Sequence, residues 1–165
     1  MFRILVVDNG AIDREMMRAV LSDRLGDVVE ILQAAGREDA NHILKMQRID
    51  LLIADVLVSS AMVKHLVRLA RSLNENAAVI LTSVKSGAEM AQLAVRLNAK
   101  GYLLKPFRRE KLLELVCPLV VESREQNSRA AENRAERDRA LCLAAIGSNI
   151  HECQYKKSLE TAKEY

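Results

Sequence analysis

Several features that mark whole classes of protein are absent or scarce in this sequence. The three cysteines, Cys117, Cys142 and Cys153, are odd in number and lack C-x-x-C spacing, which argues against a disulfide framework or a zinc site. Two prolines and six glycines are too few for a turn-rich β-sandwich. No apolar run approaches the ~20 residues that cross a bilayer, and Met1–Val7 is too short for a signal-peptide core. We therefore expect a cytoplasmic protein without membrane contact.

Charge and length narrow the classes further. The chain has 165 residues, enough for one ordinary domain and an appendage. Half of the residues are hydrophobic and 28% are charged, which excludes a disordered chain. The 25 basic and 22 acidic residues leave a net charge of +3, too mild to indicate nucleic-acid binding by itself.

Short apolar runs alternate with amphipathic segments up to about Val121. Continuous apolar runs of this length are typical of strands in a parallel sheet that is buried on both faces. The alternation predicts a doubly wound α/β domain with right-handed crossovers over residues 1–121. The expected strands are Ile4–Val7, Val28–Leu32, Leu51–Ala54, Ala78–Leu81 and Tyr102–Leu104.

The composition changes after Val121. Glu122–Arg139 contains five arginines and five acidic residues with no glycine or proline, which predicts a solvated helix. We expect residues 122–165 to form a helical extension. Within it, Gly147 predicts a helix end before a second helix over Ile150–Tyr165. Pro118 is expected to kink or interrupt the path into this extension.

Residues suited to phosphate and metal chemistry stand at four of the five expected strand ends. Asp8 and Asn9 follow the first strand, Asp55 the third, Thr82 the fourth and Lys105 the fifth. In a doubly wound sheet, ligands bind outside the carboxyl ends of the strands. Any one of these residues could be an ordinary cap or surface residue. Together they predict a polar site on one rim of the sheet.

The motifs at these strand ends resemble the receiver domain of two-component response regulators, which belongs to the CheY-like superfamily. The resemblance covers roughly Met1–Val121, and it implies a flavodoxin-like strand order of 2-1-3-4-5. It also implies that Asp55 is the phosphoacceptor, that Thr82 is the switch hydroxyl, that Lys105 is the catalytic lysine and that Tyr102 is the switch aromatic. The matching motifs are Ile4-Leu-Val-Val-Asp8, Asp50-Leu-Leu-Ile-Ala-Asp55, Val79-Ile-Leu-Thr82-Ser83 and Gly101-Tyr-Leu-Leu-Lys105-Pro106-Phe107.

The same resemblance implies a magnesium ion as cofactor. A hard divalent cation takes carboxylate, carbonyl and water ligands, which suits Asp8, Asn9, Asp55 and the backbone carbonyl of Leu57. The family usually has two adjacent acids after the first strand, whereas this chain has Asp8 and Asn9. Because one formal charge is lost, we expect weak Mg²⁺ binding.

The family loop after the phosphoacceptor also differs in this chain. A proline and a glycine usually stand four and eight residues beyond the acceptor, where this chain has Ser59 and Val63. The loop Leu57–Met62 is consequently more apolar than is usual. These departures bear on phosphorylation kinetics and leave the expected fold unchanged.

Three functional hypotheses follow. The first is a response regulator that receives a phosphoryl group from a sensor histidine kinase and assists its own phosphorylation and dephosphorylation, rather than acting as an enzyme on other substrates. The second is a pseudo-receiver, a binding module that is regulated without phosphorylation. The third, a small flavodoxin-like cofactor enzyme, is disfavoured because no Ser/Thr/Gly-rich loop follows the first strand.

The extension suggests how an output is reached. Leu141, Leu143 and Ile146 would leave an apolar end exposed on a monomer, so we expect a homodimer. The charge balance of Glu122–Arg139 offers no basic footprint for DNA. Contact with DNA is therefore expected only through an output domain beyond Tyr165, as in a longer transcription regulator.

Overall fold

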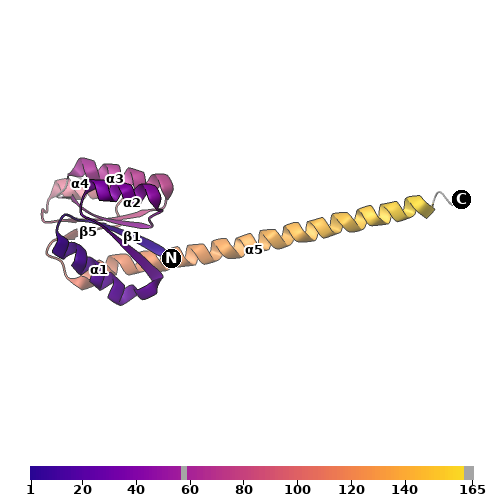
Figure 1. Ribbon diagram of the computed structural model, residues 1–165, viewed down its shortest axis with the longest axis horizontal. Helices are drawn as coiled ribbons and strands as arrows, with labels where there is room; N and C mark the ends of the chain where they lie inside the picture. The colour runs from indigo at the N-terminus through magenta and orange to yellow at the C-terminus, as the bar shows by residue number, and fades with distance from the viewer. Residues whose placement is uncertain (57–58, 162–165) are drawn as a thin grey trace. The chain divides into compact units, whose positions relative to one another are not determined.

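A computed structural model describes the backbone of residues 1–56 and 59–161 and the side chains of residues 1–56 and 59–140. The chain divides into two compact units, Met1–Val121 and Glu122–Tyr165. In the first unit, five parallel strands form one sheet in the order β2-β1-β3-β4-β5 (Figure 1), which confirms the expected fold class and strand order. The strands are β1 (Phe2–Val7), β2 (Val29–Ala34), β3 (Leu51–Asp55), β4 (Ala78–Ser83) and β5 (Gly101–Leu104).

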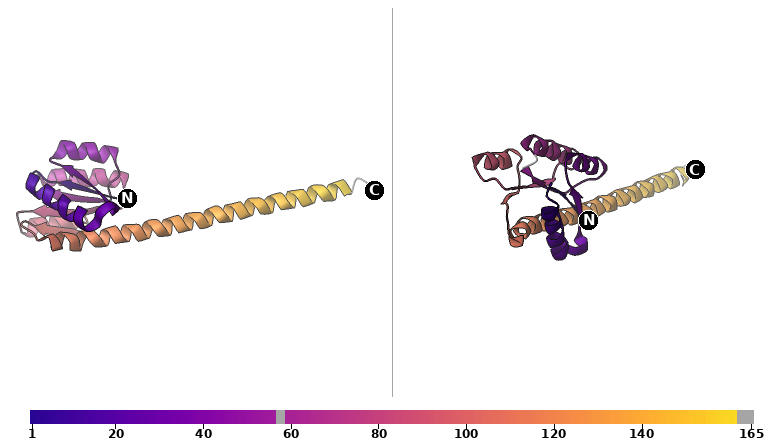
Figure 2. Two further views of the ribbon diagram at one scale, coloured as in Figure 1. Left: turned by 60° about the horizontal axis from the view of Figure 1, so that its bottom comes forward. Right: turned by 60° about the vertical axis from the view of Figure 1, so that its left-hand side comes forward.

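Helices cover both faces of this sheet. Helices α2, α3 and α4 lie on one face, and α1 with the first turns of α5 lies on the other (Figures 1 and 2). A short 3₁₀ helix, η1 (Gly26–Val28), leads from α1 into β2. The helices are α1 (Ala11–Leu25), α2 (Arg37–Met46), α3 (Ser60–Leu73), α4 (Ala88–Arg96) and α5 (Arg109–Thr161).

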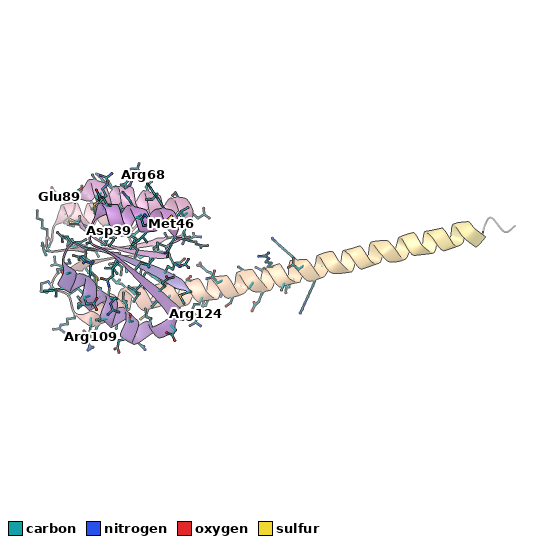
Figure 3. The ribbon with its side chains drawn as sticks, in the orientation of Figure 1. Asp39, Met46, Arg68, Glu89, Arg109 and Arg124 are labelled. Atoms are coloured by element: carbon teal, nitrogen blue, oxygen red, sulfur yellow. The ribbon has the colours of Figure 1, made fainter. Side chains whose placement is uncertain are left out.

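The strands owe their continuous apolar sequences to this two-sided burial. Successive side chains of a strand point to opposite faces, so Leu5 packs toward α2–α4 and Ile4 toward α1 and α5. Every residue of β3 and β4 is buried, whereas the edge strand β5 is only partly buried. The helices bury one stripe each and keep charged residues outside, as Asp39, Arg68 and Glu89 show in Figure 3. The core therefore lies on both sides of β1, β3 and β4.

The Leu115 side chain of α5 closely approaches Gly101, the first residue of β5. A Cβ atom placed on Gly101 would lie 2.5 Å from Cδ1 of Leu115, which is closer than carbon atoms tolerate. Glycine at the start of β5 therefore lets the helix sit directly on the strand. The carboxyl end of β5 leads to Lys105 in the site.

The helix end expected at Gly147 is wrong, and Pro118 does not interrupt the helix. Helix α5 runs from Arg109 to Thr161 without a break, through both Pro118 and Gly147. A helix tolerates an interior glycine at a cost of roughly 1 kcal/mol, and flanking turns can outweigh the hydrogen bond that a proline lacks. Around Pro118 those turns are held by Leu112, Val116 and Val120, which are buried against the sheet.

Side chains in the second unit are described up to Ala140. Between Glu122 and Ala140 all of them are exposed except Ser123, which is half-buried. The dimer prediction rests on Leu141, Leu143 and Ile146, whose side chains lie outside the described residues. Within the part of the chain that the structure describes, no helix is both long and apolar enough to cross a bilayer.

Candidate functional site

The carboxyl edge of the sheet brings four of the sequence-predicted residues to one place. Asp8 follows β1, Asp55 is the last residue of β3, Thr82 lies in β4 and Lys105 follows β5. Asp55 and Thr82 are paired in register on neighbouring strands, so their side chains share one face of the sheet. Asp8, Asp55 and Thr82 are almost fully buried, with exposures of 0%, 1% and 0%. Buried polar groups at this density indicate a site rather than a packing surface.

Lys105 joins the carboxylates of this edge. Its Nζ lies 2.5 Å from Oδ2 of Asp8 and 2.7 Å from Oδ2 of Asp55. The Lys105 side chain is only 9% exposed. Burial by itself would lower the pKa of the Lys105 ammonium, but hydrogen bonds to Asp55, Asp8 and Asp13 and the charge of Asp8 outweigh it and raise that pKa. Lys105 therefore remains a fixed positive charge beside Asp55.

Thr82 contributes an unused hydroxyl. Its Oγ1 is buried and has no hydrogen-bond partner, a state that no other buried side-chain polar atom shares among the described residues. An unsatisfied buried hydroxyl costs about 1–3 kcal/mol, so its retention calls for an explanation. A group that arrives next to Asp55 with an acceptor oxygen would provide the missing partner.

The main chain around Asp8 is held by its own turn. The Gly10 N–H donates to Oδ1 of Asp8 at 2.8 Å, and the Arg14 guanidinium donates to the Asp8 carbonyl oxygen at 2.6 Å. The Asp8 N–H donates to the carbonyl of Ala34 and so extends the pairing of β1 with β2. These bonds leave Oδ2 of Asp8 directed at Lys105.

Three other predicted residues stand in different situations. Tyr102 is half-buried, and its hydroxyl donates to the carbonyl of Lys85 at 2.5 Å, in the segment that links β4 and α4. Asn9 is exposed, unlike its neighbour Asp8. Leu57, whose carbonyl was predicted to bind the metal, lies outside the described residues.

Sequence reasoning missed one member of the cluster. Oδ2 of Asp13, in the first turn of α1, lies 2.9 Å from Nζ of Lys105. Asp13 stands five residues after Asp8, and a side chain near a helix start points back toward the N-terminus of that helix. A carboxylate one turn into a helix that begins at the polar edge is the signal that could have revealed it.

The donor set fits a hard divalent cation. Oδ2 of Asp8 and Oδ2 of Asp55 already converge on one cation, the Lys105 ammonium, and both are buried. Mg²⁺ is usually held by one or two carboxylates and several waters, not by a cage of protein ligands alone. Asp8, Asp13 and Asp55 surround Lys105, but among the described residues no three His, Cys, Asp or Glu side chains are arranged to hold a metal by themselves. Two buried carboxylates, one lysine and one free hydroxyl can accept and stabilise a phosphoryl group.

Comparison with known proteins identifies a family for this chain. The family model described as the response regulator receiver domain matches residues 4–117. Protein CcdB of Bacillus subtilis is 29% identical over 119 residues, which are 70% of this chain and 95% of that protein. Response regulator MprA of Mycobacterium bovis is 28% identical over 157 residues, which are 95% of this chain but only 66% of that protein.

Solved structures agree with the sequence comparison. A response regulator from Thermotoga maritima superposes with a TM-score of 0.63 at 26% identity, over 73% of this chain and 98% of that one. Chemotaxis protein CheY4 of Vibrio cholerae gives a TM-score of 0.62 at 25% identity, over 72% and 98% of the two chains. Because the family model covers residues 4–117, well over half of the chain, this chain belongs to the response regulator receiver domain family.

Proposed function

We propose that this chain is the phosphoryl-accepting part of a cytoplasmic two-component response regulator, with Asp55 as the acceptor. The observation behind the proposal is the buried Asp55 carboxylate, which lies 2.7 Å from the Lys105 ammonium and next to the unpartnered Thr82 hydroxyl. The phosphodonor would be a phosphohistidine of a sensor histidine kinase. This arrangement retains acceptor, cation and hydroxyl, and it does not favour the pseudo-receiver alternative.

The chemistry follows from charge and position. An oxygen of Asp55 attacks phosphorus, a P–O bond forms, the P–N bond of the phosphohistidine breaks, and the leaving imidazole takes up a proton. Most of the catalysis of such a transfer is positioning and charge stabilisation. Lys105 supplies a fixed positive charge, and Thr82 can donate its hydroxyl hydrogen to a phosphoryl oxygen. A bound Mg²⁺, held by Asp8 and Asp55, would balance further negative charge on the phosphoryl oxygens.

In this reading the chain assists a reaction on itself. The attacked group and the groups that assist it belong to one site, and the product is the modified protein. We therefore assign the chain no enzymatic activity on other substrates. Its output is a conformational change that follows phosphorylation.

The proposal is tested by mass. Full-length protein incubated with a small acyl-phosphate donor and Mg²⁺ should gain one phosphoryl group, and Asp55→Asn should gain none. Asp39→Asn, which changes an exposed carboxylate on α2, should be modified like the wild type. An adduct on Asp55→Asn would contradict the assignment of the acceptor, and an unmodified wild type would favour the pseudo-receiver.

We further propose that Thr82 and Tyr102 form the switch. A hydrogen bond from Thr82 to the phosphoryl group would draw the end of β4 toward Asp55 and release the Tyr102 hydroxyl from Lys85. Thr82→Ala should leave phosphorylation nearly intact but reduce the chemical-shift changes at Tyr102, whereas Thr82→Ser should preserve them. Undiminished changes in the alanine variant would contradict this coupling.

For residues 122–165 we propose a role in joining two copies and presenting an output domain. In support, the chain covers only 66% of its relative MprA, so that response regulator is longer than the part matched here. Contact with DNA would be made by an output domain beyond Tyr165. Sedimentation of the full chain should show a dimer, and a version that ends at Val121 should be a monomer. If both proteins sediment as monomers over a wide concentration range, residues 122–165 serve only as a linker.

A further inference from the structure

A third carboxylate reaches the Lys105 ammonium from outside the sheet. Oδ2 of Asp13 lies 2.9 Å from Lys105 Nζ, about as close as Oδ2 of Asp55 at 2.7 Å. Asp13 differs from the other two because its side chain is 43% exposed. It therefore stands at the mouth of the site, where a cation from solvent would enter.

Asp13 and Asp8 flank a small residue at the start of α1. A Cβ atom on Gly10 would lie 3.2 Å from Oδ1 of Asp8 and 3.4 Å from Oδ2 of Asp13. The two carboxylates are thus brought close together, with Gly10 between them. A side chain at this position would press against Asp8 and stand in ordinary contact with Asp13.

The charges of the cluster do not balance. Asp8, Asp13 and Asp55 place three carboxylates around the Lys105 ammonium, and with the Arg14 guanidinium at the Asp8 carbonyl oxygen the cluster has two cations for three carboxylates. At the same edge, the buried hydroxyl of Thr82 has no partner, although it is in register with Asp55. Excess negative charge beside an unsatisfied buried donor matches a site that receives a cation and an acceptor oxygen together.

We propose that Asp13 is a positioning residue of this site that supplies the second negative charge of its metal-binding face, in the place of Asn9. The inference rests on the proposed function and extends it to a residue outside the sheet edge. Asp13 acts through charge at the mouth and through its ion pair with Lys105, while Asp8 and Asp55 provide the buried oxygens. The exposed amide of Asn9 adds no charge there.

The experiment is a calorimetric titration of the unphosphorylated full-length chain with magnesium chloride. Asp13→Asn should weaken Mg²⁺ binding about tenfold, because a unit charge near a divalent ion is removed from a partly buried site. Asp13→Glu should retain most of the affinity. The double variant Asn9→Asp/Asp13→Asn should recover it, because the charge returns on the neighbouring position.

Asp39→Asn is the matched control. Asp39 and Asp13 are both first-turn acids of helices whose N-cap is a glycine without a side-chain cap bond. Both variants should lose a favourable interaction with the helix dipole, and Asp13→Asn should lower the melting temperature further because it also loses the ion pair with Lys105. Only Asp13→Asn should alter Mg²⁺ affinity.

The outcomes separate the inference from the proposed function. If Asp13→Asn binds Mg²⁺ within twofold of the wild type while the wild type is phosphorylated on Asp55, the role of Asp13 is wrong and the function stands. The role of Asp13 is also wrong, and the function stands, if the double variant Asn9→Asp/Asp13→Asn binds Mg²⁺ no more tightly than Asp13→Asn. A wild type that neither binds Mg²⁺ nor accepts a phosphoryl group overturns both.

Discussion

Charged side chains are used in opposite ways at the sheet edge and along residues 122–140. At the edge, Asp8, Asp55 and Lys105 are buried, and their atoms meet within 2.7 Å. In the helix beyond Val121, charged residues are exposed, and the ion pair of Arg129 with Glu125 is 4.0 Å long with side-chain exposures of 78% and 62%. Water screens the second kind of pair and not the first. The same residue types thus form a buried ion-pair cluster in one region and a solvated helix surface in the other.

The first turns of α5 and residues 122–140 also differ in what stabilises the helix. The first turns of α5 are held by Leu112, Val116 and Val120, which are buried against the sheet. Residues 122–140 have no such stripe and depend on helix propensity and on pairs one turn apart. Changes in the first region should therefore affect the stability of the domain, and changes in the second should not.

The largest expected effect is the loss of the buried cation. Lys105→Met should lower the free energy of unfolding by about 3 kcal/mol, because it leaves buried carboxylates without their counter-charge. Lys111→Met removes an exposed lysine that pairs with Glu114, and it should cost less than about 1 kcal/mol. Urea unfolding of both variants measures the difference. If both variants lose the same unfolding free energy, burial at the sheet edge does not strengthen the ion pairs of Lys105.

The contribution of Lys105 to the unfolding free energy should decrease at alkaline pH. The pKa of Lys105 is raised above its ordinary value of 10.5, so its stabilising effect is complete below that pH and declines as the pH rises above it. The difference in unfolding free energy between wild type and Lys105→Met should stay level from about pH 7 to pH 9 and narrow near pH 11. A difference that grows with alkaline pH would contradict the raised pKa.

An added charge should matter at the sheet edge only. Asn9→Asp should tighten Mg²⁺ binding about tenfold, because a further carboxylate stands next to the cluster. Asn127→Asp adds the same charge to the exposed helix and should leave the affinity unchanged. Titration with magnesium chloride compares the two. Equal affinities of Asn9→Asp and wild type would exclude Asn9 from the metal-binding face.

The smallest effect is expected in the exposed helix. Arg129→Ala breaks the pair with Glu125 and should change the unfolding free energy by no more than about 0.5 kcal/mol. Urea unfolding followed by circular dichroism detects both the global transition and any loss of helix. A cost above 1 kcal/mol would show that this side chain packs against something, such as a second copy.

Much of the fold was predictable because most strands are apolar runs, and four of the five have a polar residue at or just after the carboxyl end. Asp55, Thr82 and Lys105 could be placed at one edge from strand order alone, because parallel strands bring their carboxyl ends together. The strands extend one or two residues beyond several predicted bounds, since Ser83 and Ala34 keep the ladder hydrogen bonds without being strongly apolar.

The rest depended on three-dimensional context. Asp13 belongs to a helix in the sequence pattern, and only the turn at Gly10 and the reach of Lys105 bring it into the site. Gly147 and Pro118 are local breakers, but a long helix continues through both. Local signals predict where a helix is weakened, and they do not measure what the flanking turns contribute.

The setting of Lys105 also has a chemical consequence for the reagents that would modify this protein. Acyl phosphates can transfer their acyl group to lysine, but only a neutral amine has the lone pair that attacks. Lys105 is 9% exposed, contacts three carboxylates, and has a raised pKa, so almost none of it is neutral at physiological pH. The cluster that we propose to direct a phosphoryl group toward Asp55 therefore shields its own lysine from acylation, while lysines such as Lys64 and Lys85 are exposed to solvent.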